Sequence, residues 1–505
     1  VTVPRGASYV GKHTGDLMVS ANPWFKGVSL VQAPDGTVLV TDWCDNGECH
    51  DDDGVHRSSG RIYRIAHGTP AARPTADVAQ KPDAELAEAM TSKNEWLVRR
   101  ARRVLQERVA SGLEIAPEAR QRLHELASDP RPPVRLRALW ALHAMGHLSA
   151  AERLAAAAAE APALRSWAVR LMAEADDMSA EEAEKIVAMA RTESSPRVRL
   201  HLATVLDRVP PGLRWPMADA LVRSAGEMVD GAPDATLQLV LWHHLQPLVA
   251  SDEKKAAPLV AATVFPKLRG FIARRIAVEI EDDPDAREAL GSLIQQAADG
   301  APWAEEIMGA IRTALEGRRA LPAPFGWNRA MDKFAASPSA TLRACATELG
   351  LTFNDPAMLE RLRARFLDAA APADERRRAF DALRTSGVPE LPALVGTALA
   401  EPALRLTALR SLGLVDDAAL AKSALALWPQ LSPEEKLAAV DALVTRVTTA
   451  RLLLEALGAK KLARTDVNTT QARQIAALGD KRLAALLAKN WGQIKTTDAA
   501  REKLV

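Results

Sequence analysis

The stretch PPVRLRALWALHAMG, residues 132–146, carries the pattern that decides the fold of most of this chain. Apolar residues such as Leu136, Leu139 and Trp140 recur there at steps of three and four, the spacing of one face of an α-helix. Similar stretches follow one another from about residue 84 almost to the end of the 505-residue chain. The sequence therefore predicts a long region of many short amphipathic helices.

Two sequence signals mark where some of these helices begin. Ser179-x-x-Glu182 and Ser432-Pro433-Glu434-Glu435 are capping boxes, in which side chains satisfy the free backbone donors of the first helical turn. We therefore expect helix starts at both places.

The helical region also repeats. A segment of the form V/L-R-x-x-A/L recurs, with several spacings of 30–36 residues and wider gaps close to two periods. Such periods are typical of α-solenoids, in which each helix pair buries its apolar face by stacking on the next. The period resembles HEAT or armadillo repeats, although it is shorter than their usual 40–47 residues or so, and it predicts about ten to twelve helix pairs. We expect the recurring arginine to bridge neighbouring helices; it lies at Arg99, Arg135, Arg165, Arg199, Arg269, Arg343 and Arg405.

Composition excludes several classes of function. With 65 basic and 64 acidic side chains, the chain has no overall field that would favour nucleic acid. No apolar run reaches the roughly 18 residues of a membrane span. Neither G-x-S-x-G, a Walker loop nor G-x-G-x-x-G occurs, and tryptophans such as Trp140 and Trp167 fall at helical core positions, where packing explains them.

Before about residue 70 the apolar pattern has period two instead. Two apolar runs flank Ala33-Pro34-Asp35-Gly36, which predicts a hairpin, and residues 60–65 alternate again as a third strand. Three antiparallel strands and a partial lead-in leave open edges and one apolar face, so we expect this sheet to need a neighbour. The predicted organisation is a β segment over residues 1–69, a proline-rich linker over 70–83 and a HEAT-like helical domain over 84–505.

The sharpest candidate for chemistry is the acidic loop DWCDNGECHDDDGVHR, residues 42–57. Its carboxylates suit a hard cation such as calcium, whereas its histidines would favour zinc or iron. The candidate metal ligands are Asp42, Glu48, His50, Asp51 and His56. Alternatives stay open: solvated carboxylates without a metal, a Cys44–Cys49 disulfide in an exported protein, or haem attachment at the C-x4-C-H string.

Several stretches also resemble a known family, namely large PVC-type proteins described as membrane-bound dehydrogenases or haem-binding C-x-x-C-H proteins. The resemblance covers essentially the whole chain; its most distinctive part is GECH, residues 47–50, followed by SGRIY, residues 59–63. Members of that family carry an export signal, a β-propeller like that of pyrroloquinoline-quinone (PQQ) sugar dehydrogenases, a HEAT-like region and a C-terminal cytochrome c domain.

The resemblance implies that this chain is the last propeller strands plus the helical region, with upstream blades and a downstream cytochrome c domain in the same parent protein. It implies PQQ and haem c as cofactors of the parent and a periplasmic or otherwise extracytoplasmic location. The acidic loop would lie on a propeller face. Candidate contacts to a quinone carboxylate or another anion are Arg57 and Arg61, with Lys12 and His13 approaching from the preceding blade.

Two functions follow from these observations. In the first, the chain is the C-terminal part of an exported sugar or alcohol dehydrogenase, and its helices hold the propeller at a distance from an electron-accepting cytochrome. In the second, it is a non-catalytic HEAT-type scaffold that binds a protein partner and carries a structural cation loop. Blade repeats upstream and a C-x-x-C-H downstream in the DNA would favour the first function.

Overall fold

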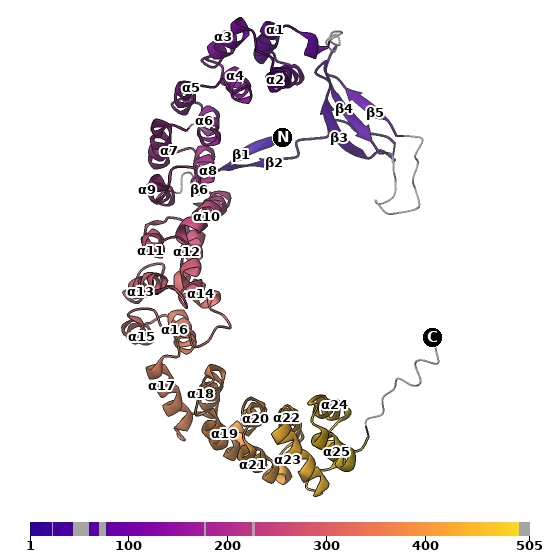
Figure 1. Ribbon diagram of the computed structural model, residues 1–505, viewed down its shortest axis with the longest axis vertical. Helices are drawn as coiled ribbons and strands as arrows, with labels where there is room; N and C mark the ends of the chain where they lie inside the picture. Colours follow the sequence, from indigo (N-terminus) through magenta and orange to yellow (C-terminus); the bar gives the residue numbers. More distant parts are fainter. Residues whose placement is uncertain (23, 44–59, 70–76, 176–177, 225–227, 494–505) are drawn as a thin grey trace. The chain divides into compact units, whose positions relative to one another are not determined.

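A computed structural model describes residues 1–22, 24–43, 60–69, 77–175, 178–224 and 228–493 (Figure 1). The chain forms two compact units, Val1–Ile276 and Ala277–Val505. Within the described residues, no helix combines the length and the apolar character that crossing a membrane requires.

The first unit opens with the predicted antiparallel sheet, in the order β3-β4-β5. Its strands are β3 (Gly27–Gln32), β4 (Val38–Asp42) and β5 (Ile62–Ile65). At the β3–β4 turn, the Ala33 amide donates to the Thr37 carbonyl at 2.8 Å, and Gly36 has a φ of 82°, which favours glycine. The predicted hairpin and third strand are therefore confirmed.

This sheet buries little apolar surface. The central residue Val40 is only 5% exposed, and Phe25 packs edge-on against Tyr63 with ring centroids 5.5 Å apart. In contrast, the side chains of Leu30, Trp43 and Ile62 are 72%, 69% and 69% exposed. The described part of the sheet thus leaves large apolar side chains uncovered.

The lead-in to the sheet forms a separate hairpin, β1 (Thr2–Arg5) and β2 (Ser8–Gly11). The tip of this hairpin reaches helices of the same unit (Figure 1). The Ala7 amide donates to Asp234 Oδ2 at 2.8 Å, and Asp234 Oδ1 accepts from the Leu237 amide at 2.9 Å. One buried carboxylate therefore both caps a helix and holds the hairpin tip.

The helical part of the first unit begins at residue 78, so its first turn lies inside the predicted linker. Its elements are η1 (Val78–Gln80), α1 (Asp83–Glu88), η2 (Ala89–Thr91), α2 (Glu95–Ala110), α3 (Pro117–Leu126), α4 (Pro132–Ala144), α5 (Ala150–Ala157), α6 (Pro162–Glu174), α7 (Ala180–Thr192), α8 (Pro196–Thr204), α9 (Pro211–Val222), β6 (Met228–Val229), β7 (Ala232–Pro233), α10 (Ala235–Val249), α11 (Glu253–Ala262) and α12 (Pro266–Val278). The two units divide within α12.

The second unit is entirely helical over its described residues. Its elements are α13 (Pro284–Ala298), α14 (Ala304–Ala314), α15 (Trp327–Ala335), α16 (Ala340–Thr352), α17 (Pro356–Leu367), α18 (Ala373–Ser386), α19 (Leu391–Ala400), α20 (Pro402–Ser411), η3 (Leu412–Leu414), α21 (Ala418–Ala426), η4 (Trp428–Gln430), α22 (Pro433–Leu443), α23 (Val447–Gly458), η5 (Arg464–Asp466), α24 (Thr469–Ala477) and α25 (Lys481–Asn490).

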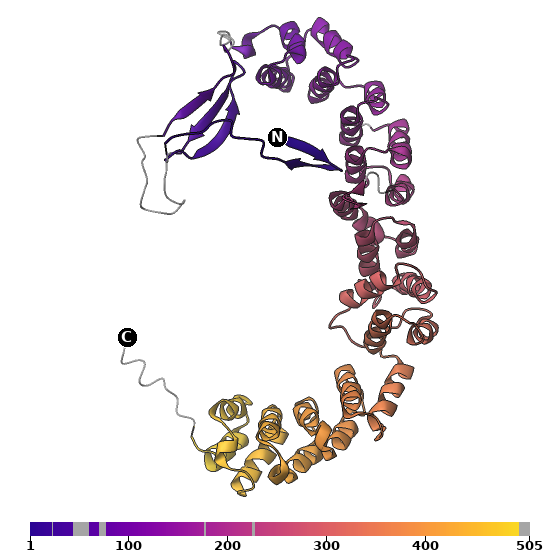
Figure 2. The ribbon, with the colours of Figure 1, turned by 180° about the vertical axis from the view of Figure 1, so that it is seen from behind.

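Within each unit the helices stack in two layers, as both views show (Figures 1 and 2). The extensive contacts join helices that are adjacent or next but one in the sequence, such as α5 with α6 and α6 with α8. This nearest-neighbour pattern is that of an α-solenoid. The predicted mainly α, HEAT-like fold is therefore confirmed, and the 25 α-helices of the described residues agree with the ten to twelve pairs expected.

Both predicted capping boxes are present. In α7 the Ser179 side chain accepts from the Glu182 amide and the Glu182 side chain accepts from the Ser179 amide; Ser432 and Glu435 do the same in α22. Helices α7 and α22 therefore begin where the sequence predicts.

At five of its seven predicted positions, Arg99 and Arg135 excepted, the recurring arginine joins consecutive helices. At five positions its guanidinium donates to the backbone carbonyl six residues earlier, at the end of the preceding helix, over 2.5–3.4 Å. Carbonyls at a helix C-terminus lack partners within the helix and carry the negative end of its dipole, so a cation there is stabilising. The five are Arg165, Arg199, Arg269, Arg343 and Arg405. Arg99 departs from this pattern and donates to Gln32 in β3.

Candidate protein-binding site

Most of the acidic loop that the sequence singles out lies outside the described residues. This holds for Glu48, His50, Asp51, His56 and Arg57. The metal, disulfide and haem interpretations of the loop therefore stay predictions.

Two other predicted site residues, Asp42 and Arg61, belong to the described part of the chain. Asp42 ends β4 and is 7% exposed, and its Oδ1 accepts from the Lys26 amide at 2.9 Å. The backbone carbonyl of Arg61 accepts from the Asp42 amide at 2.8 Å. These contacts hold β4 against its neighbours, so Asp42 has a structural part in the sheet.

Lys12 and His13 lie just beyond the open end of the β1–β2 hairpin. The Lys12 amide donates to the Val1 carbonyl at 2.7 Å, and His13 Nε2 lies 3.2 Å from Asp16 Oδ1 at an exposed position. Across the ranges that the structure describes, no three His, Cys, Asp or Glu side chains are placed to hold one metal ion. The described residues thus bring together no predicted cofactor or metal site.

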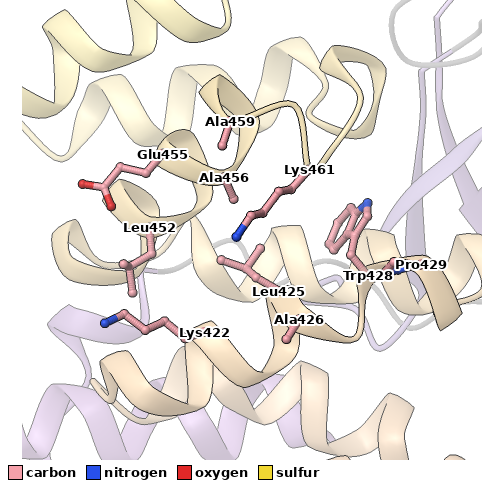
Figure 3. A pocket seen from close by; sticks show the side chains of 10 residues that line it. All are labelled: Lys422, Leu425, Ala426, Trp428, Pro429, Leu452, Glu455, Ala456, Ala459 and Lys461. Carbon is pink, nitrogen blue, oxygen red and sulfur yellow. The ribbon is translucent and has the colours of Figure 1, made fainter.

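A hollow that the sequence analysis did not predict lies in the second unit, between α21 and α23 (Figure 3). We call it the α21–α23 groove; its volume is about 680 Å³. Its lining residues are Lys422, Leu425, Ala426, Trp428, Pro429, Leu452, Glu455, Ala456, Ala459 and Lys461.

Small side chains create the hollow. Ala426 on α21 faces Ala456 and Ala459 on the α23 side, and a methyl group fills too little of the space between two helices to close it. Buried Leu425 and half-buried Leu452 supply the apolar floor. The groove is therefore apolar at its base.

Trp428, in η4, forms a buried wall of the groove. Its Nε1 donates to Asp466 Oδ2 at 3.2 Å, and the Lys436 ammonium lies 5.8 Å from its ring centroid. The hydrogen bond satisfies the only polar atom of the indole side chain, so the ring can present apolar surface at a fixed orientation.

The rim of the groove carries charge. Lys422 on α21 and Lys461 after α23 extend over it from different segments, and Lys461 points across the middle toward Leu425 (Figure 3). Among the described residues, neither lysine has an ion-pair partner. The charged side chains of the lining are Lys422, Lys461 and Glu455, and it contains no histidine, cysteine or serine.

A second surface feature lies in the first unit, on α2, α4 and α6. The Arg102 guanidinium lies 5.2 Å from the Trp140 ring centroid, Trp140 and Trp167 pack edge to face at 4.8 Å, and Arg170 lies 4.9 Å from the Trp167 ring. Both indoles are partly buried, so packing accounts for them as predicted, although neither lies fully inside the core. They pack between repeats and under arginines at the surface.

No family model matches the sequence, and no curated protein matches it. Solved structures with a similar arrangement include a multiply substituted Kap121p, with 13% identity and a TM-score of 0.44 over 84% of this chain and 52% of that one. Others are Kap121p bound to Nup53p, with 13% identity, a TM-score of 0.35 and coverage of 84% and 57%, and a model of the full-length AP-3 complex, with 11% identity, a TM-score of 0.39 and coverage of 81% and 80%. The chain spans about half the length of the Kap121p chains it matches.

Proposed function

We propose that this protein is a non-catalytic α-solenoid scaffold that binds a protein partner in the α21–α23 groove. The observation that carries the proposal is the groove itself: an apolar floor, a fixed indole wall and a charged rim on a stack of helices. A solenoid presents long continuous surfaces of this kind because each repeat adds helix faces to the same layer.

The groove has the size and chemistry for one anchoring segment of a partner. Its volume of about 680 Å³ lies within the range of roughly 300–1,000 Å³ typical of ligand pockets. Burying one leucine or phenylalanine side chain against the floor would contribute about 1.5–3 kcal/mol. A few such side chains carry most of the energy of a protein interface.

The proposal can be tested by filling the groove. Ala426 is exposed at the rim, so Ala426→Trp should occupy the hollow without disturbing the core. The matched control is Ala476→Trp, at an exposed position of α24 that does not line the groove.

Tagged full-length wild type and both variants would be compared by affinity capture from extracts of the source cells, and each captured protein would then be purified and titrated. We expect a partner whose affinity falls at least tenfold with Ala426→Trp and is unchanged with Ala476→Trp. Equal binding to all three proteins would contradict the proposal.

The exposed apolar side chains of the β3–β4–β5 sheet favour a second candidate function. Leu30, Trp43 and Ile62 would be covered if this sheet were the last blade of a larger β domain. The chain would then be the C-terminal part of an extracytoplasmic dehydrogenase, with PQQ and haem c bound by other parts of the parent. Sequencing the flanking DNA tests this: blade repeats upstream and C-x-x-C-H downstream support it, and a stop codon directly after residue 505 contradicts it.

A further inference from the structure

We infer that the α21–α23 groove recognises an acidic peptide segment anchored by one or two large apolar side chains. This inference rests on the proposed function, because it names the chemistry of the partner that the same groove would bind.

The apolar half of this preference comes from the floor. Leu425, Trp428 and Ala456 are each less than 10% exposed, so their side chains cannot move away to let a polar group be hydrated there. A polar side chain placed on this floor would lose its water without gaining a hydrogen bond, whereas a leucine would gain by burial. The anchor is therefore apolar.

The acidic half comes from the rim, where the lining holds two lysines against the single carboxylate Glu455. Lys422 and Lys461 come from different segments; Lys422 lies at one edge of the hollow and Lys461 reaches over its middle (Figure 3). A carboxylate beside the anchor can approach both. A basic segment would be repelled by two like charges there. This repulsion discriminates against basic partners more strongly than the attraction selects acidic ones.

Some surface cations of this unit are already paired. Arg410 pairs with Glu434 at 3.0 Å, and Arg312 lies 3.3 Å from Glu348. A ligand must break such a pair before it can use the cation. At the groove no ion pair among the described residues competes for Lys422 or Lys461, so both remain available to a ligand.

Three fluorescein-labelled octapeptides test the inference on the full chain by fluorescence anisotropy. The first has two central leucines flanked on each side by three glutamates, the second replaces the glutamates by lysines, and the third replaces the leucines by alanines. We expect the first to bind at least tenfold more tightly than either of the others.

Charge reversal sharpens the test. The double variant Lys422→Glu/Lys461→Glu should lose at least tenfold in affinity for the glutamate peptide and gain affinity for the lysine peptide. The control Lys481→Glu, at the start of α25 and outside the groove, should leave both affinities unchanged. Circular dichroism would establish that each variant keeps its helical content.

The possible outcomes distinguish failure of this inference from failure of the proposed function. If the glutamate peptide binds no more tightly than the lysine peptide, the inference is overturned, even when Ala426→Trp removes a protein partner and so supports the proposed function. If the charge preference is present but Ala426→Trp leaves it intact, the peptide binds elsewhere and the inference is likewise overturned.

Discussion

The β3–β4–β5 sheet and the helical stack differ in how far they bury their apolar side chains. In the stack each helix covers the apolar stripe of its neighbours, so residues such as Phe380 and Leu409 are completely buried. In the sheet, Leu30, Trp43 and Ile62 remain mostly exposed, although its three strands are paired in antiparallel register.

The difference shows that secondary structure and burial are separable. The three strands pair with little burial of their apolar side chains, whereas the helices are stabilised mainly by stacking that buries theirs. A one-dimensional stack supplies a covering neighbour at every step, but a single small sheet does not. Four experiments test this contrast.

The largest effect is expected in the core of the stack. Phe380 on α18 is fully buried and lies 5.3 Å, centroid to centroid, from Phe366 on α17. Phe380→Ala should destabilise the second unit by about 3–5 kcal/mol because it leaves a cavity. Leu30→Ala in the sheet should change stability by less than about 0.5 kcal/mol. Urea unfolding of the full chain, followed by circular dichroism and hydrogen exchange of α18, measures both; similar costs for the two variants would remove the contrast.

The next largest effect concerns a buried ion pair between repeats. Arg153 Nε on α5 donates to Glu182 Oε1 on α7 at 2.6 Å, and the two side chains are 4% and 0% exposed. Arg153→Met should cost about 3 kcal/mol because it leaves Glu182 buried without its cation. The double variant Arg153→Met/Glu182→Met should cost less than the sum of the two single changes, as measured by the same unfolding experiment. Full additivity would show that the pair is not coupled.

A smaller effect is expected where the N-terminal hairpin meets the helices. Gly6 has a φ of 57°, and an added Cβ would collide with the Asp234 carboxylate. Gly6→Ala should cost about 1–3 kcal/mol of local stability and release the hairpin tip while the stack stays folded. Hydrogen exchange at the Ala7 amide reports the release. Gly11→Ala is the control, because a Cβ there meets nothing within 4 Å; equal exchange in both variants would argue against the contact.

The smallest effect is an acid sensitivity of the stack. Burial would raise the pKa of Glu182, but hydrogen bonds from Arg153 and Ser179 outweigh it and lower that pKa; a hydrogen bond from Arg131 lowers the pKa of Asp129 to about 2. Lowered carboxyl pKa values stabilise the fold above the unfolded values of about 4 and lose this contribution as the pH falls through the folded values. The urea midpoint should hold between pH 7 and 5 and then fall toward pH 2. The urea midpoint of the Asp129→Asn variant should fall less steeply with decreasing pH than that of the wild type. An identical slope would exclude Asp129 as a contributor to the acid sensitivity.

Much of the fold could be predicted from local pattern, because the signals are local in origin. The step of three and four in residues 132–146 predicts α4, the Ser179–Glu182 box predicts the start of α7, and Ala33–Gly36 predicts the β3–β4 turn. The bridging role of the recurring arginine could also be predicted, because its carbonyl partner lies only six residues earlier in the chain.

The candidate site could not be found in this way. Ala456 follows the same helical period as the alanines that pack fully in the core, so nothing in the pattern marks it as the base of a hollow. Trp140 and Trp167 also follow the core period but are only partly buried, and arginines from their own and a neighbouring helix lie over their rings.

The sequence alone therefore established a helical repeat region and the β3–β4–β5 strands, because periodicity, caps and turns depend on residues close together in the chain. Only the tertiary structure decided that residues 1–11 form a hairpin held by Asp234, and that α21 and α23 leave a groove between them. Both depend on how side chains more than twenty residues apart share volume and hydrogen bonds, and no periodicity within one element records that.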